Sequence, residues 1–553
     1  MPLTRRQVLA VTNVTRRKLL AMGGVTAAAT VVATPGEAIA ADRHRRGGHA
    51  CPPTPSPADV RPADPRYEDL ATRGFNARFA ARPESIRVVH DATQVAGAVR
   101  DAVRDGKRIA VRSGGHCFDA LVDDPAVQLI IDMGEMDAVY FDAPRRAFAV
   151  EPGATLGQVY RTLFTNWGVT LPAGVCPSVG MGGHVAGGGY GPLSRRDGIV
   201  IDHLYAVEVV VVDAAGQART VVATREAADP HRDLWWAHTG GGGGNFGVVT
   251  KYWFRSPGAT GSDPARLLPR PPATLRKASA SWTWNQLDEQ KFSRLVRNHG
   301  AWHARVDSDP AYASLHSGFS LNQASFWQEG MGAITLDIAI DGTTGQADRL
   351  IDRYLAAVGE GVGLEPTVTR HDTAWMKAAL TDAYQPGIYN RSKSKGAYLR
   401  RTWSDRQIAV VYEHLREPLY TGAVTVLLYS YGGKVNTVPT TATASPQRDS
   451  ILKSWYSINW AGSDDDGANV DWLRRFYQAV HADTGGVPVP NDITDGSFIN
   501  YPDVDLLDPT WNSSAVPWHE LYYKQNYLRL QQVKARWDPR DVFRHPLSIR
   551  PPA

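Results

Sequence analysis

The sequence predicts an α+β protein in which an α/β region is followed by an antiparallel sheet covered by helices. Its 553 residues exceed what one hydrophobic core usually holds, which predicts two or three domains. From about residue 84, short apolar strands alternate with helical patterns. Residues 256–275 then shift to Pro, Gly and Ser, and the later mixture of β-forming segments and longer helical stretches is typical of an α+β domain.

The first forty residues predict an export signal. Paired arginines at 16–17 precede an apolar run that ends at residue 33, and residues 38–40 (Ala-Ile-Ala) have the pattern of a cleavage site. This arrangement resembles a twin-arginine signal, so we expect a secreted protein that uses the twin-arginine export machinery. A second pair at 5–6 leaves open which pair directs export, and an ordinary secretory signal or an amphipathic helix is the alternative. The basic, Pro-rich residues 41–66 predict a flexible leader.

The charge balance gives no reason to expect a nucleic-acid partner. Residues 1–40 hold five basic residues and one acidic residue, which leaves 55 of each in the rest of the chain. A net charge of zero lacks the basic excess that binds phosphate backbones. No later apolar run is long enough to predict a membrane span. The three cysteines, Cys51, Cys117 and Cys176, are too few for a disulfide framework, so their interest lies in single thiols.

The α/β region begins with an apolar strand at 86–89 and a helix that Asp91 or Thr93 caps. Asp105 and Gly106 end that helix. Further strands are predicted at 108–111, 127–132, 146–151 and 205–213, and helices at 155–166 and 229–237. The strand at 108–111 runs directly into Arg112-Ser113-Gly114-Gly115-His116-Cys117.

After residue 275 the predicted elements are those of a sheet with covering helices. Strands are predicted at 276–284, 312–320, 333–341 and 423–429, and helices at 286–304, 345–358, 405–415 and 468–482. An amphipathic helix is predicted from Leu521 to Arg536. The aromatic residues at 282, 284, 302, 327 and 375 either form a wall on which a carbohydrate stacks or belong to the core.

Three segments concentrate glycine, at 112–117, 180–191 and 240–247. Glycine lets backbone N–H groups approach an anion closely, so such loops suit a cofactor that carries phosphates. The third segment satisfies G-x-G-x-x-G, but residues 233–236 before it have a helical pattern, which argues against a Rossmann site.

Two of these segments neighbour nucleophilic side chains. Together with the glycine loops, His116 and Cys176 indicate anchors for an electrophilic cofactor, although either residue alone is more often an inert buried side chain. A zinc site from His116, Cys117, Cys176 and His184 is the competing interpretation. It lacks the usual C-x-x-C or H-x-x-x-H spacing, so no metal is expected.

Residues 111–117 (Val-Arg-Ser-Gly-Gly-His-Cys) resemble the histidyl-flavin attachment loop of the vanillyl-alcohol-oxidase superfamily. Residues 172–191 resemble the cysteinyl attachment segment of its berberine-bridge-enzyme-like branch. The resemblance continues through residues 241–247, Asn500-Tyr501-Pro502-Asp503, 522–527 and 538–545, and so spans nearly the whole chain after the signal.

The resemblance implies a fold and a cofactor. It implies a two-subdomain FAD-binding domain of the vanillyl-alcohol-oxidase type, with an N-terminal part at 67–262. A substrate-binding domain with an antiparallel sheet is expected at 263–495, and a C-terminal segment at 496–553 is expected to return to the FAD domain. FAD is expected to be attached twice, through His116 to the 8α-methyl carbon and through Cys176 to C6 of the ring.

Sixteen residues are expected to contact this cofactor. They are His116, Cys176, Arg112, Ser113, Gly114, Gly115, Cys117, Gly182, Gly183, His184, Gly189, Asn245, Gly247, Asn500, Tyr523 and Asn526.

The resemblance also implies the reaction. The family's base is a tyrosine in the Asn-Tyr-x-Asp motif, here Tyr501, which must be held near its phenolate form by donors or positive charge. Tyr429 stands where the alkaloid-cyclising members have a glutamate, and it is either a second catalytic tyrosine or an ordinary sheet aromatic.

The expected function follows from that site. We expect an exported oxidase that converts an alcohol of a glycosylated or polyketide metabolite to a ketone, or performs a related dehydrogenation, with O2 reduced to H2O2. A hexose or oligosaccharide oxidase that makes a lactone is the alternative. A flavin-binding protein without catalysis is the interpretation from another functional class.

Overall fold

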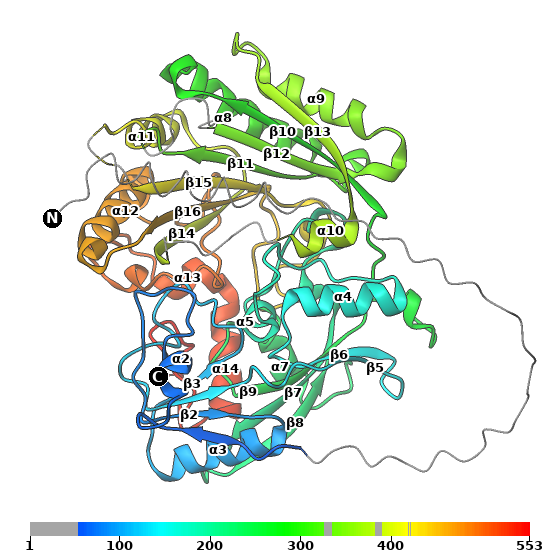
Figure 1. Cartoon of the computed structure of the whole chain (residues 1–553), viewed down its shortest axis with the longest axis vertical. Coiled ribbons are helices and arrows are strands. Elements are labelled where there is room, and N and C mark those ends of the chain that lie inside the picture. The colour runs from blue at the N-terminus through cyan, green and yellow to red at the C-terminus, as the bar shows by residue number, and fades with distance from the viewer. Residues whose placement is uncertain (1–53, 326–333, 382–389, 419, 421, 553) are drawn as a thin grey trace, which may run out of the picture. The chain divides into compact units, whose positions relative to one another are not determined.

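A four-stranded sheet opens the part of the chain that the structure, a computed structural model, describes: residues 54–325, 334–381, 390–418, 420 and 422–552. Its strand order is β1(Ala58–Val60), β2(Ser85–Val88), β4(Leu129–Asp132) and β3(Ile109–Arg112). The last three are parallel, as α/β alternation predicts, and β1 is antiparallel to β2. Helix α3(Ala92–Arg104) begins where the Asp91 carboxylate accepts a hydrogen bond from the Gln94 N–H. β3 leads directly into the first glycine segment (Figure 1).

The second sheet has five antiparallel strands. In order they are β5(Val139–Asp142), β6(Ala147–Val150), β9(Val248–Phe254), β7(Leu204–Val212) and β8(Ala218–Thr224). Helix α4(Leu156–Trp167) starts at a capping box between Thr155 and Gln158. The short helices α5(Met181–Ala186) and α7(Arg232–Ala237) flank the second and third glycine segments.

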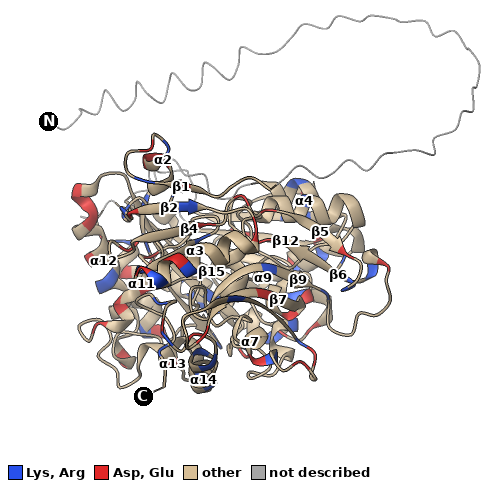
Figure 2. Cartoon of the chain, turned by 90° about the horizontal axis from the view of Figure 1, so that it is seen from below, with Lys and Arg blue, Asp and Glu red and all other residues tan. Residues whose placement is uncertain are grey.

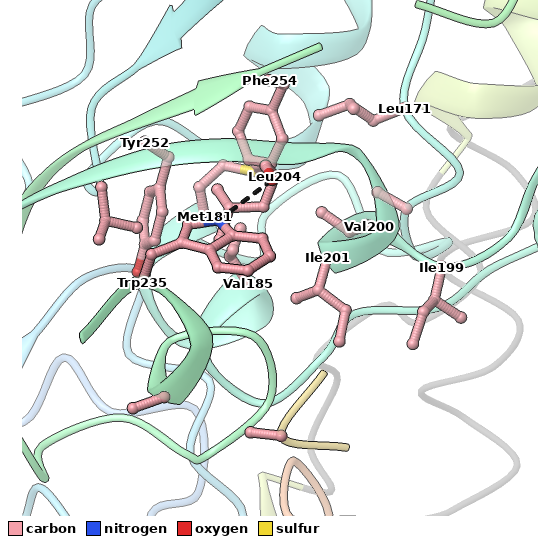
Figure 3. Close-up of a cluster of buried hydrophobic side chains, with 14 of the residues drawn as sticks. Leu171, Met181, Val185, Ile199, Val200, Ile201, Leu204, Trp235, Tyr252 and Phe254 are labelled. Atoms are coloured by element: carbon pink, nitrogen blue, oxygen red, sulfur yellow. Dashed lines mark hydrogen bonds between the residues drawn. The ribbon is translucent and has the colours of Figure 1, made fainter. Parts of the chain in front are cut away.

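A buried apolar cluster fixes α5 to this second sheet (Figure 3). Met181 and Val185 of α5 lie fully buried among residues of β7, β9 and α7. The Trp235 indole N–H donates a hydrogen bond to the Leu204 carbonyl at 3.2 Å, which ties α7 to the same sheet. The glycine-rich turn before α5 is therefore held by a rigid core, although glycine itself restricts the backbone little.

The third sheet has seven antiparallel strands. In order they are β13(Thr367–Ala374), β10(Thr274–Trp282), β12(Ile334–Asp341), β11(His316–Asn322), β15(Ala423–Ser430), β16(Leu452–Trp460) and β14(Arg391–Leu399). Helices α8(Glu289–Val306), α9(Ala347–Gly359), α11(Asp405–Leu415) and α12(Asp466–Val480) pack on it through one apolar core (Figure 1). The α+β class expected from the sequence is confirmed.

The C-terminal residues return to the second sheet's side of the molecule. Helices α13(Trp518–Tyr523) and α14(Tyr527–Trp537) replace the single helix expected at 521–536, because Lys524 adopts a positive φ of 47° between them. The buried Lys534 ammonium donates to the Asn245 carbonyl at 2.9 Å and to the Asp538 carboxylate at 2.7 Å. Contact between 496–553 and the region before residue 262 is thus present, while the domain boundaries themselves stay predictions.

Several elements differ from those that the sequence predicts. Residues 58–60 fall in the expected flexible leader, yet they form β1, because Val60 is fully buried and the strand pairs with β2. The strands β5, β8, β9, β13, β14 and β16 were not predicted. The expected signal at 1–40, the leader up to residue 53 and Cys51 lie outside the described residues.

Charged residues of both signs are interspersed over the described chain (Figure 2). None of its helices is both long and apolar enough to span a bilayer.

Candidate functional site

One cavity of about 720 Å³ brings the predicted site residues together, a volume usual for cofactor and substrate sites. Its walls come from the loop after β3, the segment 174–191, the loop before β9, the sheet face of β11, β14, β15 and β16, and residues 498–502. Fourteen of the eighteen predicted residues line it: Arg112, Ser113, Gly114, Gly115, His116, Cys117, Cys176, Gly182, Gly183, His184, Gly247, Tyr429, Asn500 and Tyr501.

Two glycine segments meet backbone to backbone at this cavity. A Cβ atom on Gly114 would lie 2.4 Å from the Gly180 nitrogen, and one on Gly180 would lie 2.2 Å from the Ser113 Oγ. Only glycine permits that approach at both positions. The Ser113 hydroxyl donates to the Pro152 carbonyl and accepts from the Gly182 N–H at 3.3 Å, which fixes the two loops relative to each other. This is a backbone cradle of the kind that phosphate groups occupy.

A buried arginine supplies positive charge to the cradle. The Arg112 side chain is fully buried, and its Nε donates to Asp132 at 3.0 Å. Arg112 lines the cavity, and its buried Nη1 has no hydrogen-bond partner among the described residues, with an Asp123 carboxylate oxygen 3.8 Å away. An unpaired buried donor of this charge fits the pyrophosphate of a dinucleotide cofactor. The residues present therefore fit FAD.

The predicted attachment residues lie on different walls of the cavity. The His116 ring stacks on Phe75, with centroids 4.8 Å apart and an interplanar angle of 23°. Cys176 lies in the loop before α5 and is partly buried. Burial raises the pKa of the thiol of Cys117, next to His116, to about 11, which keeps that thiol protonated at neutral pH. The described residues contain no cluster of ligating side chains suited to a metal ion.

His184 and Asn500 join the second glycine segment to the Tyr501 segment. The His184 Nε2 accepts a hydrogen bond from the Gly174 N–H at 3.3 Å, and burial lowers the pKa of this imidazole to about 4. It is therefore neutral at physiological pH. The Asn500 amide donates to the His184 carbonyl at 3.0 Å. A Cβ on Gly187 would lie 2.0 Å from the Asn500 Oδ1, so only glycine fits there.

Four predicted residues lie behind the lining rather than in it. Gly189, with φ of 60°, turns the chain after α5, and its carbonyl accepts from the Val200 N–H. Asn245 and Tyr523 both donate to the Gly241 carbonyl, at 3.0 and 3.1 Å. Asn526 donates to the Thr440 carbonyl at 2.9 Å. These four shape the walls through backbone contacts that their sequence motif alone does not reveal.

Three tyrosines that line the cavity, Tyr190, Tyr429 and Tyr501, lie close together. The Tyr501 and Tyr190 hydroxyls are 2.6 Å apart, a hydrogen bond in which either oxygen donates. The Tyr190 ring lies edge-on to Tyr429, with centroids 6.2 Å apart. Burial raises the pKa of all three hydroxyls above its usual value. A phenolate at Tyr501 therefore needs a compensating positive charge nearby.

A buried lysine, Lys453, lies against the rings of Tyr190 and Tyr501. Its ammonium lies 3.5 Å from the Tyr190 ring centroid, 3.2 Å from that of Phe498 and 5.6 Å from that of Tyr501. The side chain is almost fully buried, and Nζ has no hydrogen-bond partner among the residues described. Burial lowers the pKa of Lys453 well below its usual value. Burial alone therefore favours a neutral amine and neutral phenols, and a Lys453 ammonium would be stabilised only together with a phenolate beside it.

The sheet presents uncharged polar groups to the same cavity. Cross-strand partners Ser392 and Asn459, and Ser394 and Ser457, line it from β14 and β16. Beside them the Trp455 ring stacks at 6.0 Å on Phe118 and at 5.9 Å on Tyr501.

The aromatic wall considered from the sequence is not formed by the residues named for it. Trp282, Trp284 and Trp302 are buried in the core between the third sheet and its helices. Trp375 is buried in the apolar cluster that contains the second sheet. Residue 327 lies outside the described residues. The core interpretation of these four tryptophans is confirmed.

Sequence reasoning missed several residues that the structure brings into the site. Tyr190 stands inside the glycine segment at 180–191, and its place between glycines could have marked it. Lys453, Trp455 and His316 carried no such signal, because their strand positions become meaningful only when β11, β15 and β16 are neighbours. His316 lines the cavity and stacks on Tyr429, with centroids 5.9 Å apart.

Family models match both ends of this arrangement. Residues 83–221 match the model described as FAD binding domain, and residues 497–550 match the model described as berberine and berberine like. The first contains His116 and Cys176, and the second contains Tyr501.

Known proteins match nearly the whole chain. It is 56% identical to aclacinomycin-N/aclacinomycin-A oxidase of Streptomyces galilaeus, over 97% of this chain and 98% of that protein. It is 30% identical to hexose oxidase of Chondrus crispus, over 88% and 93%.

Solved structures agree with these relatives. The crystal structure of aclacinomycin oxidoreductase matches with 58% identity and a TM-score of 0.87, over 90% of this chain and 100% of that one. A glycopeptide hexose oxidase complexed with teicoplanin matches with 50% identity and a TM-score of 0.86, over 91% and 100%. The chain belongs to the berberine-bridge-enzyme-like family of FAD-linked oxidoreductases, as its attachment motifs predict.

Proposed function

We propose that this protein is an oxidase that converts an alcohol of a glycosylated or polyketide metabolite to a ketone, or performs a related dehydrogenation. The observation that carries the proposal is one cavity that holds His116, Cys176, Tyr429 and Tyr501. A relative named for aclacinomycins at 56% identity supports this substrate class, as does a glycopeptide oxidase structure at 50%.

In this proposal FAD is attached twice, through His116 to the 8α carbon and through Cys176 to C6. Both residues line the cavity, and the glycine cradle with Arg112 suits the rest of the cofactor. The chemistry that FAD would supply there is acceptance of a hydride from the alcohol carbon and return of the electrons to O2, which gives H2O2.

The protein's own part is to remove the hydroxyl proton. Tyr501 accepts it as a phenolate, and Tyr190 shares the resulting charge and proton through the 2.6 Å hydrogen bond. The Lys453 ammonium beneath the rings compensates the phenolate before the proton arrives. Tyr429 faces Tyr190 from β15 and bounds the place where the substrate must sit.

A carbohydrate oxidase that makes a lactone is the second candidate. The specific observation in its favour is the uncharged row of Ser392, Ser394, Ser457 and Asn459, whose side chains suit sugar hydroxyls. The 30% identity to a hexose oxidase agrees with it. Release of H2O2 with a panel of free sugars and glycosylated polyketides separates the two candidates. The first candidate predicts release with the glycosylated polyketides, and the second predicts release with the free sugars.

The proposed attachment is tested by acid precipitation of the purified protein. A yellow pellet under a colourless supernatant is expected for the parent. The pellet should lose its colour only in the double variant His116→Ala/Cys176→Ala, because either anchor alone keeps the flavin attached. A colourless parent pellet under a yellow supernatant would mean that FAD binds without attachment. Full attachment in both single variants and in the double variant would refute the assignment of these anchors.

We further propose export by the twin-arginine route, which rests on the arginines at 16–17 and the cleavage pattern at 38–40. Replacement of residues 16–17 by lysines is expected to retain the protein in the cytoplasm, whereas the same replacement at 5–6 is the matched control. Unchanged export of the first variant, or a block by the second alone, would reassign the signal.

A further inference from the structure

A buried set of charged side chains lies behind the wall of the cavity, on the face of β14 opposite to Ser392 and Ser394. We call it the lysine–aspartate cluster, and its members are Lys393, Lys395, Asp119, Asp503 and Asp505. Each of these side chains is at most 4% exposed. Arg474, which is 28% exposed, pairs with Asp505 at 2.6 Å and completes a balance of three positive and three negative groups.

The cluster joins three segments that are far apart in the sequence. Lys393 lies on β14 of the third sheet, Asp119 follows His116 by three residues, and Asp503 follows Tyr501 by two. The Lys393 Nζ is 3.2 Å from the Asp119 Oδ2 and 2.8 Å from the Asp503 Oδ1. The same Asp119 oxygen accepts from the Val504 N–H at 3.1 Å. Lys393 therefore binds the His116 loop and the Tyr501 segment at the same point.

Lys395 differs from Lys393 in its contacts. It is equally buried on the same face of β14, and it pairs with Asp503 and Asp505, both at 2.7 Å. No contact joins it to Asp119 in the described part of the chain. The two lysines thus carry the same charge and burial, but Lys393 alone reaches the His116 loop.

A second tie holds the same loop to the same strand. The Asn76 amide donates to the Phe118 carbonyl at 3.0 Å and to the Ser392 carbonyl at 2.9 Å, and its oxygen accepts from the Ser392 N–H. Next to Asn76, the Phe75 ring stacks on His116. The imidazole is thus held from one side by Phe75, and its loop is anchored to β14 by the residues at 392 and 393.

Stability alone does not explain such a cluster. Burying charges costs about as much free energy as their pairing returns, so a buried network contributes little net stability compared with apolar packing. It does require one relative position of the groups that it joins, since each ammonium needs its carboxylates within hydrogen-bond distance.

We propose that Lys393 is a positioning residue for His116, which holds the His116 loop against the Tyr501 segment so that the imidazole and the phenol meet one flavin ring. This inference rests on the proposed attachment of FAD. Misplacing a reacting group by about 1 Å slows its reaction by roughly 100-fold. Loosening the loop is therefore expected to impair the bond at His116 while the Cys176 bond, made from a different wall, still forms.

Lys393→Met removes the tie, and Lys395→Met is the matched control. Trypsin separates the two anchors, because His116 falls in the peptide 113–145 and Cys176 in the peptide 162–195. Mass spectrometry of digests of the purified holoproteins then reports each flavin bond. Lys393→Met is expected to lose most of the His116 bond and to keep the Cys176 bond, whereas Lys395→Met keeps both.

Charge imbalance must be distinguished from loss of the tie. The double variant Lys393→Met/Asp119→Asn removes one charge of each sign, so the cluster is balanced again but the loop is still untied. We expect it to fold with a melting temperature closer to the parent's than Lys393→Met alone, and still to lack most of the His116 bond.

Several outcomes overturn the proposal. It falls if Lys393→Met keeps the His116 bond, if Lys395→Met loses that bond equally, or if the double variant recovers it. A parent protein without flavin on either peptide refutes the proposed attachment and this inference together. A doubly attached parent with an unaffected Lys393→Met refutes this inference alone.

Discussion

The hydroxyl oxygens of Tyr190 and Tyr501 lie 2.6 Å apart, although the two residues are separated by 311 positions in the chain. One of the two must donate to the other, so a negative charge formed on either ring is stabilised by a charge-assisted hydrogen bond from its partner. In the proposed reaction the base is therefore this tyrosine pair, which lies against the buried Lys453, rather than a single tyrosine.

Tyr501→Phe is expected to slow flavin reduction by roughly 10²- to 10⁴-fold, because that range is what a positioned acid–base group contributes. Flavin content should stay at the parent's level, since the substitution removes only a hydroxyl that bonds to Tyr190. Anaerobic stopped-flow reduction of the flavin by an alcohol substrate measures the rate. Tyr431→Phe is the control, because Tyr431 is buried close to Tyr190 but lies outside the cavity lining. Equal losses in both variants would contradict the role of Tyr501.

Lys453→Met is expected to move the pH dependence of flavin reduction to higher pH. Burial raises the pKa of Tyr501, and its active form is the deprotonated one, so the rate rises with pH as that phenol ionises. In the proposed ion pair, the Lys453 ammonium lies 5.6 Å from the Tyr501 ring centroid and opposes the effect of burial. Removing it leaves the phenolate uncompensated and raises the pKa further.

The measurement is the rate of flavin reduction across the acid limb of the profile. Lys453→Arg retains the charge and should keep the limb near the parent's position. The other ionisable groups that face Tyr501, namely Tyr190, Tyr429 and Cys176, are unchanged in both variants. A limb that does not move in Lys453→Met would exclude the lysine as the compensating charge.

The buried lysines also explain where prediction from sequence stopped. Helices and strands with regular apolar spacing, such as α3, α4 and β7, were predicted within a few residues. β14 and β16 were not predicted, because Lys393, Lys395 and Lys453 are of a residue type that usually faces solvent. Their burial depends on aspartates up to 274 residues away, or on a cage of rings from other segments. Those partners exist only once the fold has formed.

The candidate site was predictable to the extent that it lies in contiguous motifs. The segments 112–117 and 180–184 and Tyr501 all reach the cavity, because glycine and histidine at fixed spacing constrain the backbone locally. Tyr523 and Asn526 belong to a motif too, but their side chains turn to backbone carbonyls behind the lining. A motif identifies a segment, whereas the direction of each side chain depends on packing.

Gly180→Ala is expected to lower the flavin content of the purified protein several-fold. The added methyl would lie 2.3 Å from the Gly114 nitrogen, so the two loops of the cradle must separate. The ratio of flavin to protein absorbance measures the effect. Gly97→Ala is the control, because a Cβ there meets nothing within 4 Å and alanine favours the helix by about 1 kcal/mol. Normal flavin content in Gly180→Ala would show that the cradle does not bind the cofactor.

His299→Phe is expected to make the protein more resistant to acid. The His299 ring is fully buried, and neither ring nitrogen has a hydrogen-bond partner among the described residues. Burial lowers the pKa of this imidazole from 6.5 to about 3. Between these pH values the imidazole is protonated in the unfolded chain and neutral in the folded chain. The free energy of unfolding is thus highest above the unfolded pKa and falls as the pH drops from 6.5 towards 3.

Near pH 4 this one residue lowers the free energy of unfolding by roughly 3 kcal/mol. Phenylalanine does not titrate, so the variant does not have this loss. The variant should therefore exceed the parent's stability by an amount that grows as the pH falls, and it should already gain about 1 kcal/mol at neutral pH from removal of unpaired polar atoms. Urea unfolding at a series of pH values measures both effects. His371→Gln, at an exposed position of β13, should leave the slope unchanged. A His299→Phe curve parallel to the parent's would mean that this imidazole titrates alike in the folded and unfolded chain.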